Sequence, residues 1–346
     1  MEPGTLILFI AVLMASSAFT MIAGGHDAPN AIALPVRARA LTPRTALLLA
    51  ALLNVLGVVV GSLMMAHVGR EFLAIVPHGP AGLMVLLAAL ITAFSWDALT
   101  WWRGVPTSSS HALAAGVIGG GVALLSTDVV EIAAQEITTA TLFLLIALVL
   151  SPLIALSMAW LLVFPALWWT RDASPGVVNT PARMALSVTA AGNAFGHGLQ
   201  FGQRMYLVLA IAVSAAGIEL GSEWWITALT AAMLGGGTLL GGWRIAHTLT
   251  DRLVLLDPLR SAIASFSSAL LMFVGSLVFH LPISSSHAAA AAIIGAGQNQ
   301  SHHSVNWPQV ARLGVYFVLT LVVCAGVGLV LTAAMTPLVP GLRAGS

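Results

Sequence analysis

Long apolar stretches alternate with short polar segments along the whole chain. Apolar windows near or above the ~20 residues that cross a bilayer recur throughout. Backbone polar groups in lipid must be satisfied within the segment, and these runs are too long for barrel strands, which leaves helices. The pattern predicts an all-α polytopic protein with several passes through the cell membrane. We expect its main spans at 5–22, 45–66, 81–99, 138–169, 224–242, 261–281 and 310–336.

The composition supports the lipid bilayer as the solvent of this chain. Hydrophobic residues make up 59% of the 346 positions and charged residues only 7%, whereas a soluble domain carries about 25% charged residues. The net charge of +1 gives no basic surface, so no nucleic-acid partner is expected. Cys324 is the only cysteine, which excludes an internal disulfide and a cysteine-based metal site. No metal site is expected.

One short motif occurs twice. Pro106-Thr-Ser-Ser-Ser-His-Ala112 returns as Pro282-Ile-Ser-Ser-Ser-His-Ala288, and each copy follows an apolar span and enters a helix of small residues. The copies lie about half a chain apart, which indicates an internal duplication. We expect a first repeat at 1–169, which includes the motif segment 106–125, a connecting loop at 170–182, and a second repeat at 183–346, which includes the motif segment 282–297.

The repeated motif has the chemistry of an oxyanion site. Proline disfavours helix at the residue before it and serine is a good N-cap, so each copy should begin a helix inside the membrane. Such a start presents free N–H groups and the positive end of the helix dipole. The alternative is that the hydroxyls only bond back to a helical turn, but two matched copies favour binding. The candidates are Ser108, Ser109, Ser110, Ser284, Ser285 and Ser286, whereas His111 and His287 are expected mainly to shape the loops.

Polar residues also interrupt the first span of each half, at 24–30 and at 196–203. Asp27 is an ionisable group inside a membrane segment, which by default marks a functional site; the alternative is an aspartate wetted at a helix end. His26 beside it can change charge near neutral pH. His197 is either a structural donor between helices or part of the site, and the sequence leaves both open.

With these residues in view, the chain resembles the inorganic phosphate transporter (PiT) family over almost its whole length. The resemblance is carried by Gly24-Gly-His-Asp-Ala-Pro-Asn-Ala31, by the loops at Pro106 and Pro282, by Ala194-Phe-Gly-His-Gly198 and by Gly241-Gly-Trp-Arg-Ile245. It implies two inverted repeats, about 12 membrane segments including two re-entrant helical hairpins at 106–125 and 282–297, and in many members a homodimer. It also implies uptake of inorganic phosphate, coupled to sodium or protons, or of metal–phosphate complexes. Carried over by position, the substrate site comprises Asp27, Asn30 and the six serines.

The chain departs from the family pattern at its carboxylates. The first Asn-Asp pair of the family is His26-Asp27 here and the second is Gln200-Phe201, while a glutamate of the second span is Asn54. Its counterpart in the second half is also missing, because 261–281 contains no acidic residue. Asp27 therefore remains as the one evident carboxylate at the site.

Few carboxylates mean little negative charge to balance a sodium ion in a medium of low dielectric constant. We therefore expect proton coupling through Asp27 and His26 to replace sodium coupling. The residues expected to act in coupling or gating are His26, Asn54, His197 and Gln200. No cofactor other than a coupling H⁺ or Na⁺ is expected.

Four functions remain to be weighed. A secondary transporter for inorganic phosphate is the leading hypothesis, because phosphate carries a proton at neutral pH and Asp27 can accept it. A permease for sulfate or a related oxyanion is the alternative, since sulfate needs no acceptor. A non-transporting membrane sensor is a further alternative, supported only by the lost carboxylates. An enzyme is not expected, because adjacent Ser and His residues on a helix diverge by about 100° and nothing orients either histidine.

Overall fold

Every regular element in the described part of the protein is a helix. The computed structural model describes residues 2–64, 73–125, 134–219, 224–277, 283–300 and 304–338. Several helices begin with proline, whose fixed φ and missing N–H suit the first turn. The helices are α1 (Pro3–Asp27), α2 (Pro29–Arg37), α3 (Pro43–Leu63), α5 (Pro80–Arg103), α6 (Ser109–Leu125), α7 (Ala134–Thr170), α8 (Pro175–Ala215), α9 (Trp224–Leu240), α10 (Trp243–His247), the π-helix η1 (Thr248–Arg252), α11 (Pro258–Leu277), α12 (Ser285–Gly297), α13 (Trp307–Met335) and the 3₁₀ helix η2 (Thr336–Leu338).

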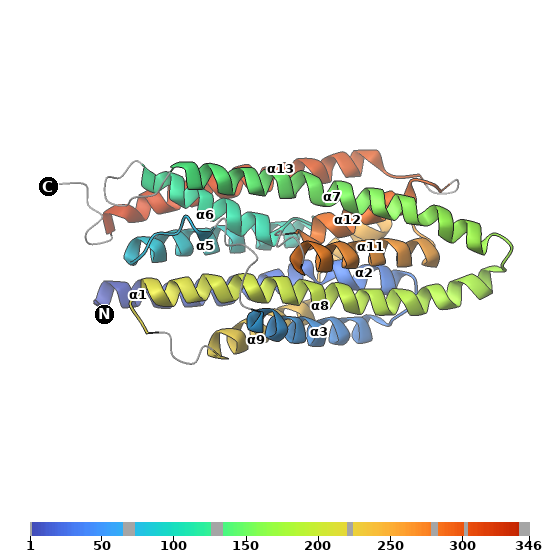
Figure 1. Ribbon diagram of the computed structural model, residues 1–346, viewed down its shortest axis with the longest axis horizontal. Helices are drawn as coiled ribbons and strands as arrows, with labels where there is room; N and C mark the ends of the chain where they lie inside the picture. Colours follow the sequence, from blue (N-terminus) through green and yellow to red (C-terminus); the bar gives the residue numbers. More distant parts are fainter. Residues whose placement is uncertain are drawn as a thin grey trace.

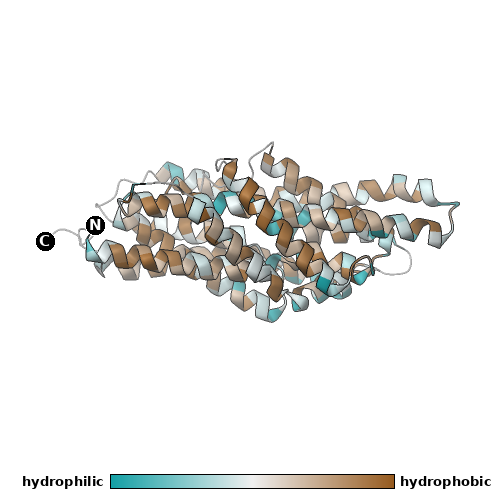
Figure 2. Cartoon of the chain, turned by 90° about the horizontal axis from the view of Figure 1, so that it is seen from below, coloured by the Kyte–Doolittle hydropathy of each residue, from teal (hydrophilic) through white to brown (hydrophobic). Residues whose placement is uncertain are grey.

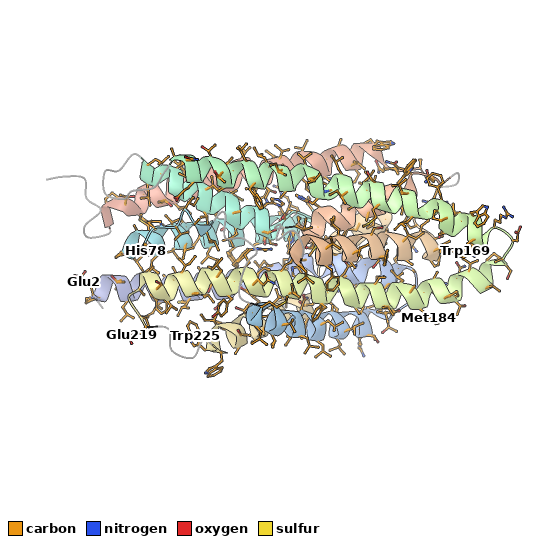
Figure 3. All side chains as sticks on the ribbon, viewed as in Figure 1. Glu2, His78, Trp169, Met184, Glu219 and Trp225 are labelled. Atoms are coloured by element: carbon orange, nitrogen blue, oxygen red, sulfur yellow. The ribbon has the colours of Figure 1, made fainter. Side chains whose placement is uncertain are left out.

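The helices lie roughly along one axis and form an elongated bundle (Figure 1). Six helical stretches in the described ranges are long and apolar enough to cross a bilayer, and a seventh results if α9 and the α10–η1 pair, bent by 58°, count as one span. Hydrophobic residues cover most of the outer helices (Figure 2). Side chains project outward from the outer helices along the whole bundle (Figure 3), and on α7 the exposed ones include Ile146, Val149 and Leu153. A bundle with so apolar a surface fits lipid rather than water.

The first span is longer than the sequence suggested. Helix α1 continues through the polar cluster to Asp27, and α2 restarts at Pro29 after the single residue Ala28. The N–H of Ala28 still donates to the carbonyl of Gly24 (3.1 Å), while Pro29 has no N–H to donate. The break therefore leaves the backbone almost helical and places Asp27 at the end of α1, deep in the bundle.

The expected interruption at 196–203 is absent, and this prediction was wrong. Helix α8 runs without a break from Pro175 to Ala215. Its glycines serve close packing instead. A Cβ on Gly198 would lie 2.7 Å from the Cα of Asn54, and one on Gly202 would lie 2.7 Å from the Cα of Val58 on α3. Glycines four residues apart let the two backbones touch, as in small-xxx-small helix pairs.

The two motif segments form short helices preceded by non-helical chain. Residues 105–108, which include Pro106, are not helical, and α6 begins at Ser109. Helix α12 begins at Ser285, and the expected start of this segment at Pro282 lies outside the described residues. At 17 and 13 residues, both helices are shorter than the ~20 residues that cross a bilayer.

The connection between the halves is short. Helix α7 ends at Thr170 and α8 begins at Pro175, so helix occupies most of the 170–182 segment that was expected to be a loop. The arginine-bearing segment after α9 is also helical, since it contains α10 and η1.

Helices of the first half pack mainly against helices of the second half. Helix α3 of the first half packs on α8 of the second, and α1 packs on α9. In the same way α6 packs on α13, and α12 packs on α7. The short helices therefore lie in the interior, each between long helices, and their starts meet near the middle of the bundle (Figure 1).

Candidate functional site

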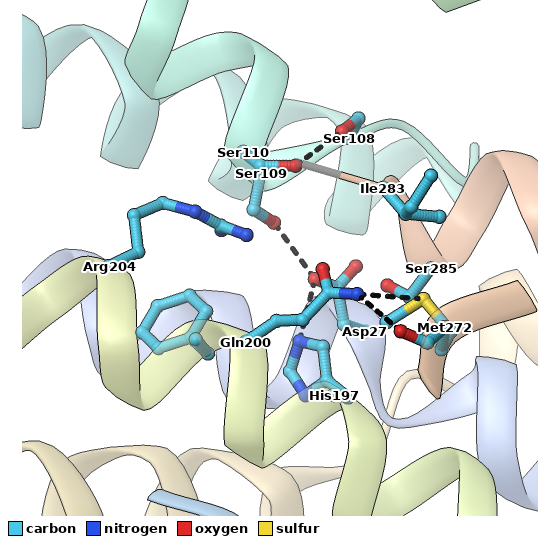
Figure 4. Close-up of a pocket in the computed structure, with 11 residues that line it drawn as sticks. Asp27, Ser108, Ser109, Ser110, His197, Gln200, Arg204, Met272, Ile283 and Ser285 are labelled. Atoms are coloured by element: carbon cyan, nitrogen blue, oxygen red, sulfur yellow. Dashed lines mark hydrogen bonds and ion pairs between the residues drawn. The ribbon is translucent and has the colours of Figure 1, made fainter. Parts of the chain in front are cut away.

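Asp27 is buried at the centre of a hydrogen-bonded cluster (Figure 4). Its Oδ2 accepts from the hydroxyl of Ser109 at the start of α6 (3.2 Å), and its Oδ1 accepts from the hydroxyl of Ser286 in α12 (3.1 Å). His26 Nδ1 lies 3.0 Å from Oδ1, and His197 Nε2 of α8 lies 3.2 Å from Oδ2. One carboxylate thus joins both serine triplets and two histidines.

The first serine of each triplet caps its own helix. Ser108 Oγ accepts from the backbone N–H of His111 (3.2 Å), and Ser284 Oγ accepts from that of His287 (3.2 Å). This satisfies one free N–H at each helix start. The first serine of each triplet is therefore the N-cap expected at the helix start, while Ser109 and Ser286 bond to Asp27.

Asn30, in the first turn of α2, contacts the second triplet. Its side-chain amide donates to Ser285 Oγ (3.2 Å) and to Ser286 Oγ (3.0 Å). Among the described residues no group donates to its buried Oδ1. In the first triplet, Ser110 Oγ lies 3.0 Å from Ser108 Oγ. The break after α1 therefore aims Asp27 and Asn30 at the same helix start.

The two histidines of the repeated motif stack on each other. The rings of His111 and His287 lie 5.0 Å apart at 17°. His111 Nδ1 is 2.6 Å from Ser108 Oγ, and the His287 ring also packs on Phe317 at 3.8 Å. Stacked rings hold the starts of α6 and α12 side by side, which is a packing role close to the loop-shaping role expected.

The residues expected in coupling surround Asp27. His197 Nδ1 lies 2.9 Å from Asn54 Oδ1, and the Asn54 amide donates to Thr238 Oγ1 of α9 (3.0 Å). His26 Nε2 lies within 3.2 Å of the hydroxyls of Thr100 and Thr107. His26 and His197 therefore link the carboxylate to three different helices.

Gln200 takes a different position from the others, since it does not contact Asp27. Its amide donates to the backbone carbonyl of Met272 on α11 (3.1 Å). It lies on the same face of α8 as His197, one turn away. Both residues border a small cavity beside Asp27.

The cavity beside Asp27 is nearly closed. It has a volume of about 10 Å³, room for about one water molecule, so an oxyanion fits only after the walls move apart. The cavity is lined by Asp27, Ser108, Ser109, Ser110, His197, Gln200, Phe201, Arg204, Met272, Ile283 and Ser285.

The sequence reasoning missed two buried charged residues. Asp97 of α5 is fully buried, and within the described chain neither of its carboxylate oxygens has a hydrogen-bond partner. It lies one helical turn before Thr100, whose hydroxyl contacts His26. Arg204 lies on α8 and lines the cavity. Both stand inside apolar helices, which is the signal that identifies Asp27; Asp27 is therefore not the one carboxylate near the site.

Comparison with known proteins shows the family and the fold of the chain. A model of the phosphate transporter family matches the chain over residues 23–175 and again over 171–328. A probable low-affinity inorganic phosphate transporter of Bacillus subtilis (strain 168) is 30% identical over 93% of this chain and 96% of its own, and one of Rhizobium meliloti (strain 1021) is 32% identical over 91% and 92%. A solved structure, "The sodium-dependent phosphate transporter", shares the fold with a TM-score of 0.70 at 18% identity, covering 96% of this chain and 100% of that one. The resemblance found in the sequence is confirmed: this multi-pass membrane protein belongs to the phosphate transporter family.

Proposed function

We propose that this protein carries inorganic phosphate across the cell membrane as a secondary transporter. The observation that carries the proposal is that Asp27 holds a serine from each of the two short helices, Ser109 and Ser286. Two helix starts and their hydroxyls supply donors to an oxyanion without a formal charge. The relatives from Bacillus subtilis and Rhizobium meliloti carry the name of inorganic phosphate transporters, which supports the same substrate.

Asp27 favours phosphate over sulfate. Phosphate has at least one proton at neutral pH, and a carboxylate can accept a hydrogen bond from it, whereas sulfate offers none. The Asp27 carboxylate also repels sulfate in a site of low dielectric constant, and sulfate has no proton to donate in compensation. Sulfate remains the alternative substrate.

The proposed coupling ion is the proton. Asn54 stands where a sodium-binding acid was expected, and its oxygen already faces His197 (2.9 Å) while its amide donates to Thr238. Titratable groups instead lie near one another: His26 contacts Asp27 at 3.0 Å, and Asp97 lies one helical turn before Thr100, whose hydroxyl contacts His26. Intramembrane Asp and His residues in series are typical of proton relays.

The proposed architecture is a pair of inverted repeats with about 12 membrane segments and two re-entrant hairpins. The helix contacts between the halves support it. If α1 corresponds to α8 and α3 to α9, the contact of α3 with α8 is equivalent to that of α1 with α9. If α6 corresponds to α12 and α7 to α13, the contact of α6 with α13 is equivalent to that of α12 with α7. Figure 1 draws α1 and α8 running in opposite directions, and the family model matches the chain twice.

In this arrangement the broken α1–α2 segment, α8 and the two short helices form the part that moves around the anion. The long apolar helices α7 and α13 form the frame. Alternating access then comes from movement of one unit against the other. A homodimer would form through the exposed faces of the frame, such as the one with Ile146 and Leu153 on α7.

Uptake into proteoliposomes tests the proposal. We expect labelled phosphate to accumulate when a proton gradient is imposed, with no requirement for sodium, and a tenfold excess of sulfate to inhibit weakly. Strong inhibition by sulfate would make it the substrate, and strict sodium dependence without a response to pH would refute proton coupling. Phosphate binding without any transport would favour the sensor.

A further inference from the structure

Arg204 is a buried cation at the edge of the cavity, and no acidic side chain of the described residues forms an ion pair with it. Its side chain lies on the same face of α8 as His197 and Gln200, because the three residues are spaced by three and four positions. Arg204 is only 4% exposed, and its Nε is buried without a hydrogen-bond partner. Among the described residues its guanidinium has no ion pair or hydrogen bond; its contact is a cation–π contact over the Phe201 ring, 5.9 Å from the ring centre.

A buried charge with no partner is costly, and such charges are normally paired or bound to a ligand. Figure 4 shows the guanidinium extended from α8 toward Ser109 and Ser110 at the start of α6. The cavity next to it is lined by Asp27 as well. The arginine therefore faces the space in which an anion would meet the hydroxyls.

The position of Arg204 matches that of Asn30 in the other half. In the two corresponding sequence segments Phe201 stands where the first half has Asp27, and Arg204 follows Phe201 by three residues as Asn30 follows Asp27. Asn30 reaches the second serine triplet, with its amide 3.2 Å from Ser285 Oγ. Arg204 lies correspondingly beside the first triplet. The duplication thus places one side chain with N–H groups beside each triplet, and the side chain from the second half is positively charged.

The positive charge of Arg204 offsets a repulsion between the substrate and Asp27 that no other group of the site offsets. An oxyanion that enters beside the Asp27 carboxylate meets a like charge, and the repulsion between two charges in contact is strong in a medium of low dielectric constant. A bound cation would remove this repulsion, but the Asn54 side chain is committed to His197 and Thr238. A guanidinium offers a fixed positive charge and a fork of donors that fits two oxygens of one phosphate.

We propose that Arg204 binds the transported oxyanion directly and supplies the positive charge that makes its binding independent of sodium. This inference rests on the proposed phosphate transport and names the residue that sets the charge of its site. The anion is then held by the guanidinium and the serine hydroxyls on one side, with its own proton directed at Asp27.

Equilibrium binding of ³²P-labelled inorganic phosphate to the purified full-length protein tests the proposal. Wild type should bind equally well in sodium and in choline buffer. Arg204→Met, which keeps length and removes charge, should weaken binding by about thirtyfold or more, as expected for loss of a desolvated charge pair. Arg204→Lys keeps the positive charge but lacks the paired N–H donors of the guanidinium, so its affinity for phosphate should lie between those of wild type and Arg204→Met. The matched control is Arg260→Met, since Arg260 pairs with Asp257 (2.6 Å) away from the cavity, and it should bind as wild type does.

Each outcome decides something. Binding by Arg204→Met within threefold of wild type would overturn the proposal, and so would wild-type binding that rises more than tenfold with sodium. The sodium comparison uses only wild type, so it decides the matter even if Arg204→Met fails to fold in size-exclusion chromatography. If wild type binds no phosphate in either buffer, it is the proposed function that fails and not the role of Arg204 within it.

Discussion

Replacing Gly198 with alanine is expected to push α3 and α8 apart and to disable the site. The new Cβ would lie 2.7 Å from the Cα of Asn54 and closer still to its carbonyl oxygen, whereas carbon atoms pack best at about 3.5–4.0 Å. The neighbour is backbone and cannot rotate away, so the helices must separate locally by about 1 Å. Overpacking of this kind costs about 1–3 kcal/mol, and the better helix propensity of alanine returns about 1 kcal/mol.

The same separation reaches the functional groups. His197 precedes Gly198, and its contact with Asn54 (2.9 Å) spans the two helices that move. A misplacement of about 1 Å in a positioned group can reduce activity by about a hundredfold. We therefore expect Gly198→Ala to lower the unfolding temperature in detergent and to reduce phosphate uptake in proteoliposomes by more than tenfold.

Gly176→Ala is the matched control, because Gly176 lies in the same helix and a Cβ there meets nothing within 4 Å. It should be as stable as wild type or more stable by up to about 1 kcal/mol, with normal uptake. If Gly198→Ala unfolds at or above the wild-type temperature and transports normally, α3 and α8 do not pack as described.

Three further predictions concern the polar cluster. Asp27→Asn should abolish the uptake of labelled phosphate. The asparagine NH₂ group would replace one of the two carboxylate oxygens that accept from Ser109 and Ser286, and an NH₂ group can only donate; normal uptake would contradict this. Ser109→Ala and Ser285→Ala should each weaken phosphate binding by about tenfold, the effect of one lost hydrogen bond of about 1 kcal/mol or slightly more, whereas Ser95→Ala on the exposed side of α5 should not. Asp97→Asn should remove the stimulation of uptake by a proton gradient while phosphate affinity stays within about threefold; a retained gradient response would exclude Asp97 from the proton path.

The sequence predicted the parts of the site that depend on local rules. Proline followed by serine places a helix start, and a duplicated motif implies two of them. Ser109 and Ser286 were expected to face one anion; both do contact Asp27, and their role in binding the anion stays a prediction. That their hydroxyls meet on Asp27 follows from tertiary packing that brings the end of α1 to the starts of both short helices, which no local rule contains.

Other features depended on partners that the sequence does not name. The glycines at 196–203 have the composition of a break, but Gly198 and Gly202 face the backbone of α3, and only the knowledge of that neighbour distinguishes packing from interruption. Arg204 and Asp97 carry the sequence signal of a charge within an apolar helix. Their relation to the site became evident from burial and from the missing partners of their polar atoms.

The central claim is that one anion binds between the starts of α6 and α12. Its most direct test is crystallography of the protein with arsenate, a tetrahedral analogue of phosphate whose arsenic can be located by anomalous scattering. The account predicts a peak within hydrogen-bonding reach of the hydroxyls of Ser109 and Ser285, beside Asp27. A peak elsewhere in the bundle, with this cavity empty in a protein shown to bind arsenate, would contradict it.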